Sequence, residues 1–393
     1  MYFRPMPIPS ATPGRAPRAA SRKALLALAL GTVLLTLLVA EFGLRVVAWL
    51  ANRRETAALA NLGHADVAPP PPGATVKLGQ MLRASADARV IFEFIPNQQV
   101  IFQNANVTIN ADGYRGALVP RPRSPGDFRI LGLGDSVMFG WGVGNDETYL
   151  ARTAATLNAA YPATRWETVN TAVPGYNTAM EAAAFENRWR AWKPDVVIVH
   201  FIGNDLTLPN FLLAPRSPWS PGRSLLWEFA ENVVRGRPRF ADPFLEEAPH
   251  AENSAGFVGD PEQVPPEYRA LVGWPAVLGG IRTLQNLAQT DGFRLVVFGS
   301  YRLPRQLRDL CDELKIPCFD AETRLDEEAA RLHLADARHP PLTLSEQDPH
   351  PSVLGQQIHA EVLLDGLVHA GLLPGVTSPP AVTTVQPNAP TKN

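Results

Sequence analysis

Four short motifs in the 393-residue sequence carry side chains that could together perform nucleophilic catalysis. A Gly-Asp-Ser tripeptide ends at Ser136, Gly175 follows a Val-Pro pair, and a Gly-Asn-Asp tripeptide is centred on Asn204. An Asp-Pro-His-Pro block near the C-terminus holds Asp348 and His350. A serine hydroxyl is a weak nucleophile until a base such as histidine takes its proton, and a carboxylate behind the imidazole fixes the tautomer. That chemistry is acyl transfer through a covalent intermediate on the serine.

Taken alone, each motif also has an ordinary structural explanation. Gly-Asp-Ser occurs in turns whose serine caps a helix, Gly175 could simply make a turn, and asparagine at position 204 is a common turn residue. The loop around His350 could serve only to place Ser352 at a helix N-terminus. Met138 stands where the Gly-x-Ser-x-Gly elbow of the α/β-hydrolases has glycine, which excludes that motif. The placement of the motifs on the expected elements favours the catalytic interpretation.

Strands and helices are expected to alternate from residue 128 onward. We predict strands at 128–134, 166–173, 195–202 and 293–299 with a short one at Cys318, and helices at 148–161, 177–192, 268–290, 305–315 and 352–369. Such alternation is typical of a parallel sheet with helices on both faces, and ligands bind beyond the C-terminal ends of its strands. Three motifs end expected strands and the fourth precedes the last helix, so all four are predicted to meet at one rim of the sheet.

In this order, the motifs resemble those of the SGNH (GDSL-type) hydrolase superfamily, which is named after its serine, glycine, asparagine and histidine. The resemblance covers residues 126–373 and implies a three-layer α/β/α sandwich of the flavodoxin-like type with a mainly parallel sheet. It implies that Ser136 is the nucleophile and His350 its base. It also implies an oxyanion hole made by the backbone N–H groups of Ser136 and Gly175 and the side-chain amide of Asn204. The stretch 110–116 is similar to a lead-in of membrane-attached bacterial members.

The acid of the expected triad departs from the usual spacing of the superfamily. Its members place an aspartate three residues before the histidine, where this chain has Gln347. Asp348 lies two residues before His350, and Glu346 lies four residues before it. We predict that Asp348 orients His350, with Glu346 as the alternative and a Ser-His dyad as a third arrangement that the superfamily allows.

The N-terminus carries a different signal, a long apolar segment after a basic one. Residues 1–23 contain four arginines and one lysine and no acid, and residues 24–40 carry no charge. At ~1.5 Å per residue the uncharged run extends ~26 Å as a helix, and the apolar pattern continues to Leu50, which suffices for a hydrocarbon core of ~30 Å. Glu41 and Arg45 in the continuation are spaced to pair on one helix face.

These features predict a single-pass membrane anchor at 24–50. The basic tail at 1–23 is expected in the cytoplasm, with the catalytic domain periplasmic or extracellular. A cleaved signal peptide is the rival interpretation, and it is disfavoured because Leu38 stands where the cleavage site before Glu41 would need a small residue.

The remaining regions complete the predicted organisation. We expect a linker at 51–75, a small β-rich lead-in at 76–125, the hydrolase domain at 126–373 with a lid-like insertion at 206–267, and a disordered tail at 374–393.

Composition and spacing narrow the possible partners. The formal net charge of −2 and the absence of a basic stretch with interleaved aromatics argue against nucleic acid. No zincin spacing and no phosphate-binding glycine loop occur, so neither a metal ion nor another cofactor is expected. The two cysteines, Cys311 and Cys318, exclude a disulfide framework, and two buried thiols are favoured over one local disulfide. His200, His339 and His359 are interpreted as structural residues.

The leading functional hypothesis is a serine esterase that hydrolyses O-acyl esters, with acylated cell-envelope or exported polysaccharide as a candidate substrate. One alternative is an O-acyltransferase that passes the acyl group to a glycan hydroxyl. The other is a degenerate SGNH domain that acts in binding or assembly.

Overall fold

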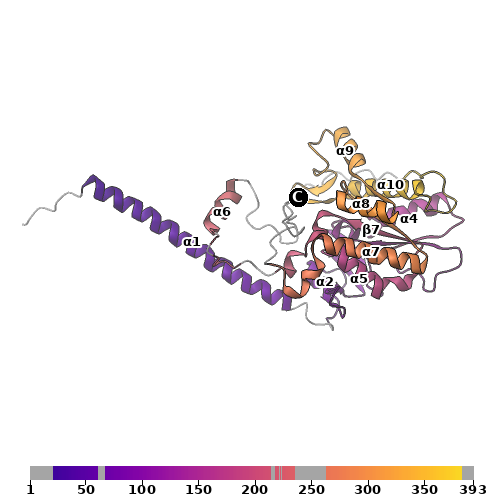
Figure 1. Ribbon diagram of the computed structural model, residues 1–393, viewed down its shortest axis with the longest axis horizontal. Coiled ribbons are helices and arrows are strands. Elements are labelled where there is room, and N and C mark those ends of the chain that lie inside the picture. Colours follow the sequence, from indigo (N-terminus) through magenta and orange to yellow (C-terminus); the bar gives the residue numbers. More distant parts are fainter. Residues whose placement is uncertain are drawn as a thin grey trace, which may run out of the picture. The chain divides into compact units, whose positions relative to one another are not determined.

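A computed structural model describes residues 21–60, 67–213, 217–220, 222, 224–234 and 263–382 of the chain (Figure 1). The chain divides into two compact units, one formed by Met1–Arg53 and Ser217–Arg239 and the other by Arg54–Arg216 and Phe240–Asn393. The second unit contains all four motifs, and each unit is described by itself below.

The larger unit is built around a five-stranded sheet in which every pair of neighbouring strands is parallel. In sheet order the strands are β6 (Trp166–Asn170), β5 (Phe128–Leu133), β7 (Val196–Phe201), β8 (Arg294–Gly299) and β9 (Cys318–Asp320). All six residues of β7 are buried, because helices cover both faces of a central parallel strand. This order, with the first strand between the second and third, is that of a flavodoxin-like sheet.

Helices cover the sheet on both faces and confirm the three-layer α/β/α prediction. α4 (Tyr149–Ala160) contacts α10 (Val353–His369), while α7 (Gly273–Asp291) contacts both α5 (Thr178–Asn187) and α8 (Arg305–Leu314). Because crossovers between parallel strands are right-handed, the strand order places α4 and α10 on one face and the other three helices on the opposite face (Figure 1).

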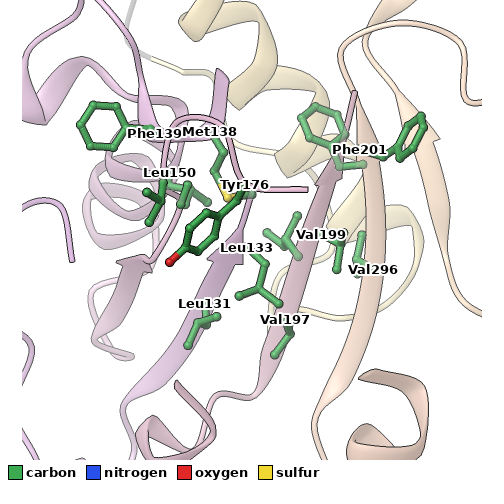
Figure 2. Close-up of a cluster of buried hydrophobic side chains, with 14 of the residues drawn as sticks. Leu131, Leu133, Met138, Phe139, Leu150, Tyr176, Val197, Val199, Phe201 and Val296 are labelled. Atoms are coloured by element: carbon green, nitrogen blue, oxygen red, sulfur yellow. The ribbon is translucent and has the colours of Figure 1, made fainter. Parts of the chain in front are cut away.

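Apolar side chains from the inner strands form a closely packed core with residues of the rim (Figure 2). The labelled members are Leu131, Leu133, Met138, Phe139, Leu150, Tyr176, Val197, Val199, Phe201 and Val296, each no more than 4% exposed. Burying a side chain of this size contributes about 1.5–3 kcal/mol. Met138 and Phe139 follow Ser136 by two and three residues, so the turn that carries the nucleophile candidate is fixed to the core.

Most predicted elements are present, with their ends shifted by one to three residues, and two are shorter than predicted. The helix expected at 268–290 begins only at Gly273, because Pro265 and Pro266 start a separate 3-10 turn, η7 (Pro266–Leu271). The helix expected at 177–192 stops at Asn187 and is followed by the 3-10 turn η3 (Trp189–Trp192).

Several short elements of the structure were not predicted from the sequence. They are α3 (Ser136–Phe139), α9 (Glu322–Arg331), the antiparallel pair β10 (Thr343–Ser345) and β11 (Asp348–Pro351), and the 3-10 turns η2 (Asn145–Glu147), η4 (Gly203–Leu206) and η5 (Asn210–Leu212).

The stretch predicted as a β-rich lead-in contains two antiparallel strand pairs. After the short helix α2 (Leu78–Met81), β1 (Leu82–Ala84) pairs with β2 (Phe92–Phe94), and β3 (Gln98–Phe102) pairs with β4 (Ala105–Ile109). A bridge between Arg115 and Asn170 joins the lead-in to the edge strand β6. The lead-in is thus part of the same compact unit as the central sheet.

The smaller unit contains most of α1 (Arg22–Ala60) and the helix α6 (Leu225–Val234). Among the described residues, the stretch Arg22–Leu50 is long and apolar enough to cross a membrane, with a mean hydropathy of 2.3 in its most apolar window. The helix does not end at Leu50 but runs on to Ala60, into the stretch predicted as a linker, of which 61–66 lie outside the described residues.

Two other predicted regions are described only in part. Residues 235–262 of the expected insertion at 206–267 lie outside the described residues, and Ser217–Arg239 group with the N-terminal unit. Of the expected tail at 374–393, residues 374–382 are described, and Val376 and Val382 are buried, so the packed chain continues beyond the predicted end of the domain. Residues 383–393 are not described.

Candidate active site

Ser136 lies at the start of α3, directly after the C-terminal end of β5. Asp135 precedes the helix as its N-cap and accepts a hydrogen bond from the backbone N–H of Val137 at 3.0 Å. The helix ends after one turn at Gly140, whose φ of 88° is in the left-handed region that glycine adopts without strain. This tight turn places the Ser136 hydroxyl at the rim of the sheet. Ser136 as a whole residue is 8% exposed.

His350 comes from the β10–β11 hairpin, 214 residues further along the chain, and reaches the same rim. Its Nε2 lies 2.8 Å from Ser136 Oγ, and its Nδ1 lies 2.7 Å from Asp348 Oδ1. The same carboxylate oxygen accepts the backbone N–H of His350 at 3.1 Å. With Nδ1 donating to the carboxylate, Nε2 is free to accept the serine proton.

The spacing of two residues between acid and base has a local structural reason. Asp348 and His350 both lie on β11, and residues two apart on a strand project from the same face. The two side chains therefore meet without a turn between them. Glu346 precedes the strand, its side chain is 62% exposed, and its carboxylate lies 3.9 Å from His339 Nε2. The structure thus brings Asp348, and not Glu346, to His350.

Two opposing influences set the ionisation of Asp348. Burial raises the pKa of the carboxyl group, but its hydrogen bond and electrostatic interaction with the His350 imidazole outweigh burial, so the pKa lies below its ordinary value. The carboxylate therefore stays ionised at neutral pH, as a group that stabilises an imidazolium requires.

Trp141 is a residue of this site that the sequence analysis missed. Its Nε1–H donates to Asp348 Oδ2 at 3.2 Å, and its ring is stacked on the His350 ring at a centroid distance of 4.9 Å and an interplanar angle of 15°. Trp141 thus fixes the carboxylate through one contact and the imidazole through another. The only signal in the sequence was its place in the glycine-rich turn after Ser136.

Of the other two motifs, Asn204 is joined by a hydrogen bond to Asp135, the residue before Ser136, and Gly175 lies in the loop after β6. Asn204, at the end of β7, donates from Nδ2 to Asp135 Oδ2 at 3.2 Å, and Ser136 Oγ lies 3.0 Å from that same oxygen. Gly175 follows β6 with a φ of 87°, and an added Cβ would lie only 2.9 Å from Cβ of Pro209. Position 175 therefore requires glycine for both its backbone conformation and its space.

Buried acids stand behind the rim. Asp135 is fully buried, and burial raises its pKa even though Val137, Asn204, His350 and Ser136 all favour the ionised form. Burial also raises the pKa of Glu181 and Asp205 well above the ordinary values. Asp205 accepts from Thr178 Oγ1 at 2.6 Å, but both Glu181 oxygens have no hydrogen-bond partner within the described part of the chain. The acid groups behind Asp135 therefore favour the protonated, neutral form.

Arg115 of the lead-in supports the turn after Ser136. It is 3% exposed, and its guanidinium donates to the carbonyl oxygens of Phe139, Gly140 and Val143. Burial lowers the pKa of Arg115 to about 9, which still leaves it protonated at neutral pH. The resemblance of 110–116 to a known lead-in included this arginine, but its contacts could not be foreseen from it.

The remaining histidines singled out in the sequence lie elsewhere. His200 and His359 are buried and bond to the same Ser300 hydroxyl at 3.0 and 2.8 Å, and His200 also bonds to the Tyr149 hydroxyl. His339 pairs with Asp336 at 2.9 Å outside this network. All three interpretations as structural residues agree with these contacts.

Within the described ranges, no cluster of three or more histidine, cysteine or acidic side chains is suited to hold a metal ion. Cys311 and Cys318 are free thiols, with Cys311 buried.

Comparison with known proteins identifies one family. The sequence model of the "GDSL-like Lipase/Acylhydrolase family" matches residues 133–358. None of the curated proteins compared with the chain matches it.

Solved structures that resemble the chain include TesA, with 14% identity, a TM-score of 0.37 and coverage of 62% of this chain and 99% of that one. A putative GDSL-like lipase from Parabacteroides merdae has 16% identity, a TM-score of 0.36 and coverage of 65% and 100%. The acetylxylan esterase Axe2 from Geobacillus stearothermophilus has 16% identity, a TM-score of 0.36 and coverage of 61% and 94%.

Proposed function

Because the chain belongs to the GDSL-like lipase/acylhydrolase family and is therefore an SGNH-type ester hydrolase, we propose that Ser136, His350 and Asp348 are its catalytic triad. The observation that supports this assignment is the continuous chain of hydrogen bonds from Ser136 Oγ through both ring nitrogens of His350 to Asp348, at 2.8 and 2.7 Å. His350 Nε2 can accept the proton of Ser136 Oγ, and the Asp348 carboxylate can stabilise the imidazolium that forms.

In this mechanism His350 Nε2 takes the proton of Ser136 Oγ while the oxygen attacks the ester carbonyl carbon. The C=O bond opens to a tetrahedral oxyanion, and the imidazolium is stabilised by Asp348. The C–O bond to the alcohol then breaks, and His350 returns its proton to the leaving alkoxide. Water repeats the sequence on the acyl-enzyme, which releases the acid and restores the Ser136 hydroxyl.

The oxyanion requires donors that are in place before the reaction. We assign this role to the backbone N–H groups of Ser136 and Gly175 and to the side-chain amide of Asn204. At rest, Asn204 Nδ2 donates to Asp135 Oδ2. The oxyanion would take over this donor, so Asp135 acts as a placeholder that keeps the amide oriented before the substrate arrives.

A fluorophosphonate probe tests the assignment without knowledge of the natural substrate. We expect the probe to label the full-length protein at Ser136 as mapped by mass spectrometry, because only a serine with a neighbouring base attacks it readily. Labelling at another serine would contradict the triad and point to a different nucleophile. No labelling in a folded protein would contradict the triad and favour a domain that acts only in binding or assembly.

For the finer function we propose hydrolysis of O-acyl esters on a cell-envelope or exported polysaccharide. The support is the apolar stretch Arg22–Leu50, which as a membrane anchor with a cytoplasmic basic tail would hold the enzyme at the cell surface. Transfer of the acyl group to a glycan hydroxyl uses the same acyl-enzyme. Incubation of an acyl donor with a carbohydrate acceptor separates the two, because transfer yields an acyl-sugar and hydrolysis yields the free acid alone.

Trp141 is expected to act as a positioning residue for His350 and Asp348. In Trp141→Phe an aromatic ring remains to stack on His350, but the donor to Asp348 Oδ2 is lost. A hydrogen bond to a charged group contributes about 1.5–3 kcal/mol, so we expect kcat to fall about 10- to 100-fold with KM unchanged. Steady-state kinetics on a p-nitrophenyl ester measures both constants.

The matched control is Trp166→Phe, which removes a hydrogen bond from Nε1 to the Tyr161 carbonyl at 3.1 Å. Trp166 begins β6, at the end of the sheet away from the site, so kcat should not change. Equal values of kcat for Trp141→Phe and the wild type would show that the contact with Asp348 has no part in catalysis.

A further inference from the structure

A carboxylate of the apolar helix α1 binds the first turn of helix α6. Glu41 of α1 accepts hydrogen bonds from the backbone N–H groups of Leu225 and Leu226 at 3.1 and 2.8 Å and from the Ser224 hydroxyl at 3.1 Å. The first N–H groups of a helix have no partner within it and favour a negative charge. Glu41 therefore caps α6 from another helix. Figure 1 shows α6 beside α1.

The turn before α6 is held to the same part of α1. Arg45 pairs with Glu41 at 2.7 Å and donates to the carbonyl oxygen of Pro218 at 2.6 Å, and the rings of Phe42 and Trp219 lie 5.7 Å apart. All these residues belong to the smaller compact unit. One turn of α1 thus supplies charge, hydrogen bonds and an aromatic surface to the segment 217–226.

The position of this turn along α1 indicates its depth in a bilayer. Glu41 and Arg45 follow Ala24, the first residue of the uncharged run, by 17 and 21 residues. At ~1.5 Å per residue they lie ~26 and ~32 Å along the helix axis, close to the far edge of a hydrocarbon core of ~30 Å. A charged pair is costly inside hydrocarbon unless its polar atoms have partners. The segment 217–226 supplies such partners at the boundary between acyl chains and headgroups.

The composition of α6 suits that boundary. Seven of its ten residues are apolar, and its two acids, Glu228 and Glu231, lie three apart and share one face. Val233 lies two residues beyond Glu231, about 200° around the axis, on the opposite face. Phe229 also lies two residues from Glu231, and Phe229 and Val233 are 43% and 44% exposed, so the face away from Glu231 is apolar and accessible. Trp227 and Val234, four residues before and three after Glu231, flank it on its own side and are 72% and 86% exposed. An amphipathic helix with an exposed tryptophan is typical of helices that lie in a membrane interface.

We propose that α6 is a second membrane-contacting element, which lies in the outer boundary of the bilayer beside α1 with its apolar face among the lipid chains. The partner is the bilayer itself. Because the polar face carries glutamates instead of lysines or arginines, contact with the bilayer depends on buried apolar area and not on attraction to anionic lipids. The inference rests on the proposed membrane anchor and extends it to a segment that follows the strand end bearing Asn204.

Depth-dependent quenching in liposomes tests this inference on the full-length protein. Three variants, Val233→Cys, Glu231→Cys and Leu34→Cys, each carry an environment-sensitive fluorophore, with the unsubstituted labelled protein as the background for Cys311 and Cys318. Nitroxide lipids carry the quencher either near the carbonyl or near the end of the acyl chain. We expect the label at 233 to show blue-shifted emission and stronger quenching by the shallow nitroxide than by the deep one. The label at 231 should keep aqueous emission with little quenching.

The label at Leu34 reports the anchor by itself, because this residue lies near the middle of the apolar stretch. Deep quenching at 34 with water-like emission at 233 would overturn the role of α6 and leave the anchor intact. Absence of quenching at 34 would refute the anchor, and with it this inference. A label at 233 that is blue-shifted but unquenched by either lipid would show that protein, not lipid, covers this face, which also overturns the proposal. The same spectra in neutral and anionic liposomes should agree, since no basic residue on α6 attracts lipid charge.

Discussion

Replacing Ser136 by alanine is expected to lower kcat for ester hydrolysis by about 10⁵- to 10⁶-fold, the range found when the nucleophile of a serine triad is removed. The substitution removes the hydrogen bonds of Ser136 Oγ to Asp135 and His350. Asp135 still accepts hydrogen bonds from the Val137 N–H and the Asn204 side chain. We therefore expect the free energy of unfolding to change by no more than about 1.5 kcal/mol. Initial rates with a p-nitrophenyl acyl ester and a thermal unfolding curve measure the two effects.

The control for this prediction is Ser124→Ala, a substitution at an exposed serine that lies outside all four motifs. It should leave both the rate and the unfolding temperature unchanged. Wild-type activity in a folded Ser136→Ala protein would mean that another residue forms the acyl-enzyme, and the proposed site would have to be abandoned.

Asp348→Asn should cost nearly as much, about 10⁴-fold in kcat, as expected for a triad that loses its carboxylate but keeps its shape. Asp348 accepts from three donors: Nδ1 and the backbone N–H of His350 on Oδ1, and Trp141 Nε1–H on Oδ2. An amide has one acceptor and one donor group. In one orientation its NH₂ group meets the Trp141 N–H, and in the other it meets His350 and forces the imidazole proton onto Nε2. The first orientation leaves Nε2 an acceptor but sets two donors against each other and removes the negative charge that stabilises the imidazolium. The second orientation deprives Nε2 of its ability to take the proton of Ser136.

Glu346→Gln is the matched control, because it makes the same chemical change two residues earlier. This side chain is exposed and lies near His339, so kcat should remain at the wild-type value. A large loss in Glu346→Gln with little change in Asp348→Asn would assign the orienting role to Glu346 and show that the hairpin rearranges when substrate binds. Equal activity in both variants would favour a Ser-His dyad.

The strands of the central sheet could be predicted from the sequence because runs of apolar residues mark them locally. Near-continuous apolar runs such as 195–202 mark buried strands, and each motif directly follows such a run or precedes a helix. The ends of parallel strands share one edge, so the residues after β5 and β7 were expected to lie close together, and the hydrogen bond from Asn204 to Asp135 joins these two ends.

Other parts of the site depend on contacts that leave no local pattern. The β10–β11 hairpin has strands of three and four residues, too short to show alternation, and its extended backbone is what brings Asp348 and His350 together at a spacing of two. Trp141 and Asp348 are 207 positions apart, so their hydrogen bond follows only from the folded structure. The attachment of Ser224 to Glu41, 183 positions apart, likewise could not be predicted from the spacing of Glu41 and Arg45 alone.

The hydrogen bonds of Arg115 show that the stretch matched by the family model does not contain every residue that supports this site. That stretch begins at residue 133, yet the three carbonyl oxygens of the turn after Ser136 bond to an arginine that precedes it. A chain cut back to the matched residues would leave these carbonyls without their donor and uncover the edge strand where Arg115 meets Asn170. Grafting, domain exchange or recombinant trimming should therefore keep the hairpins from about residue 76 onward, as part of the catalytic unit and not as a detachable leader.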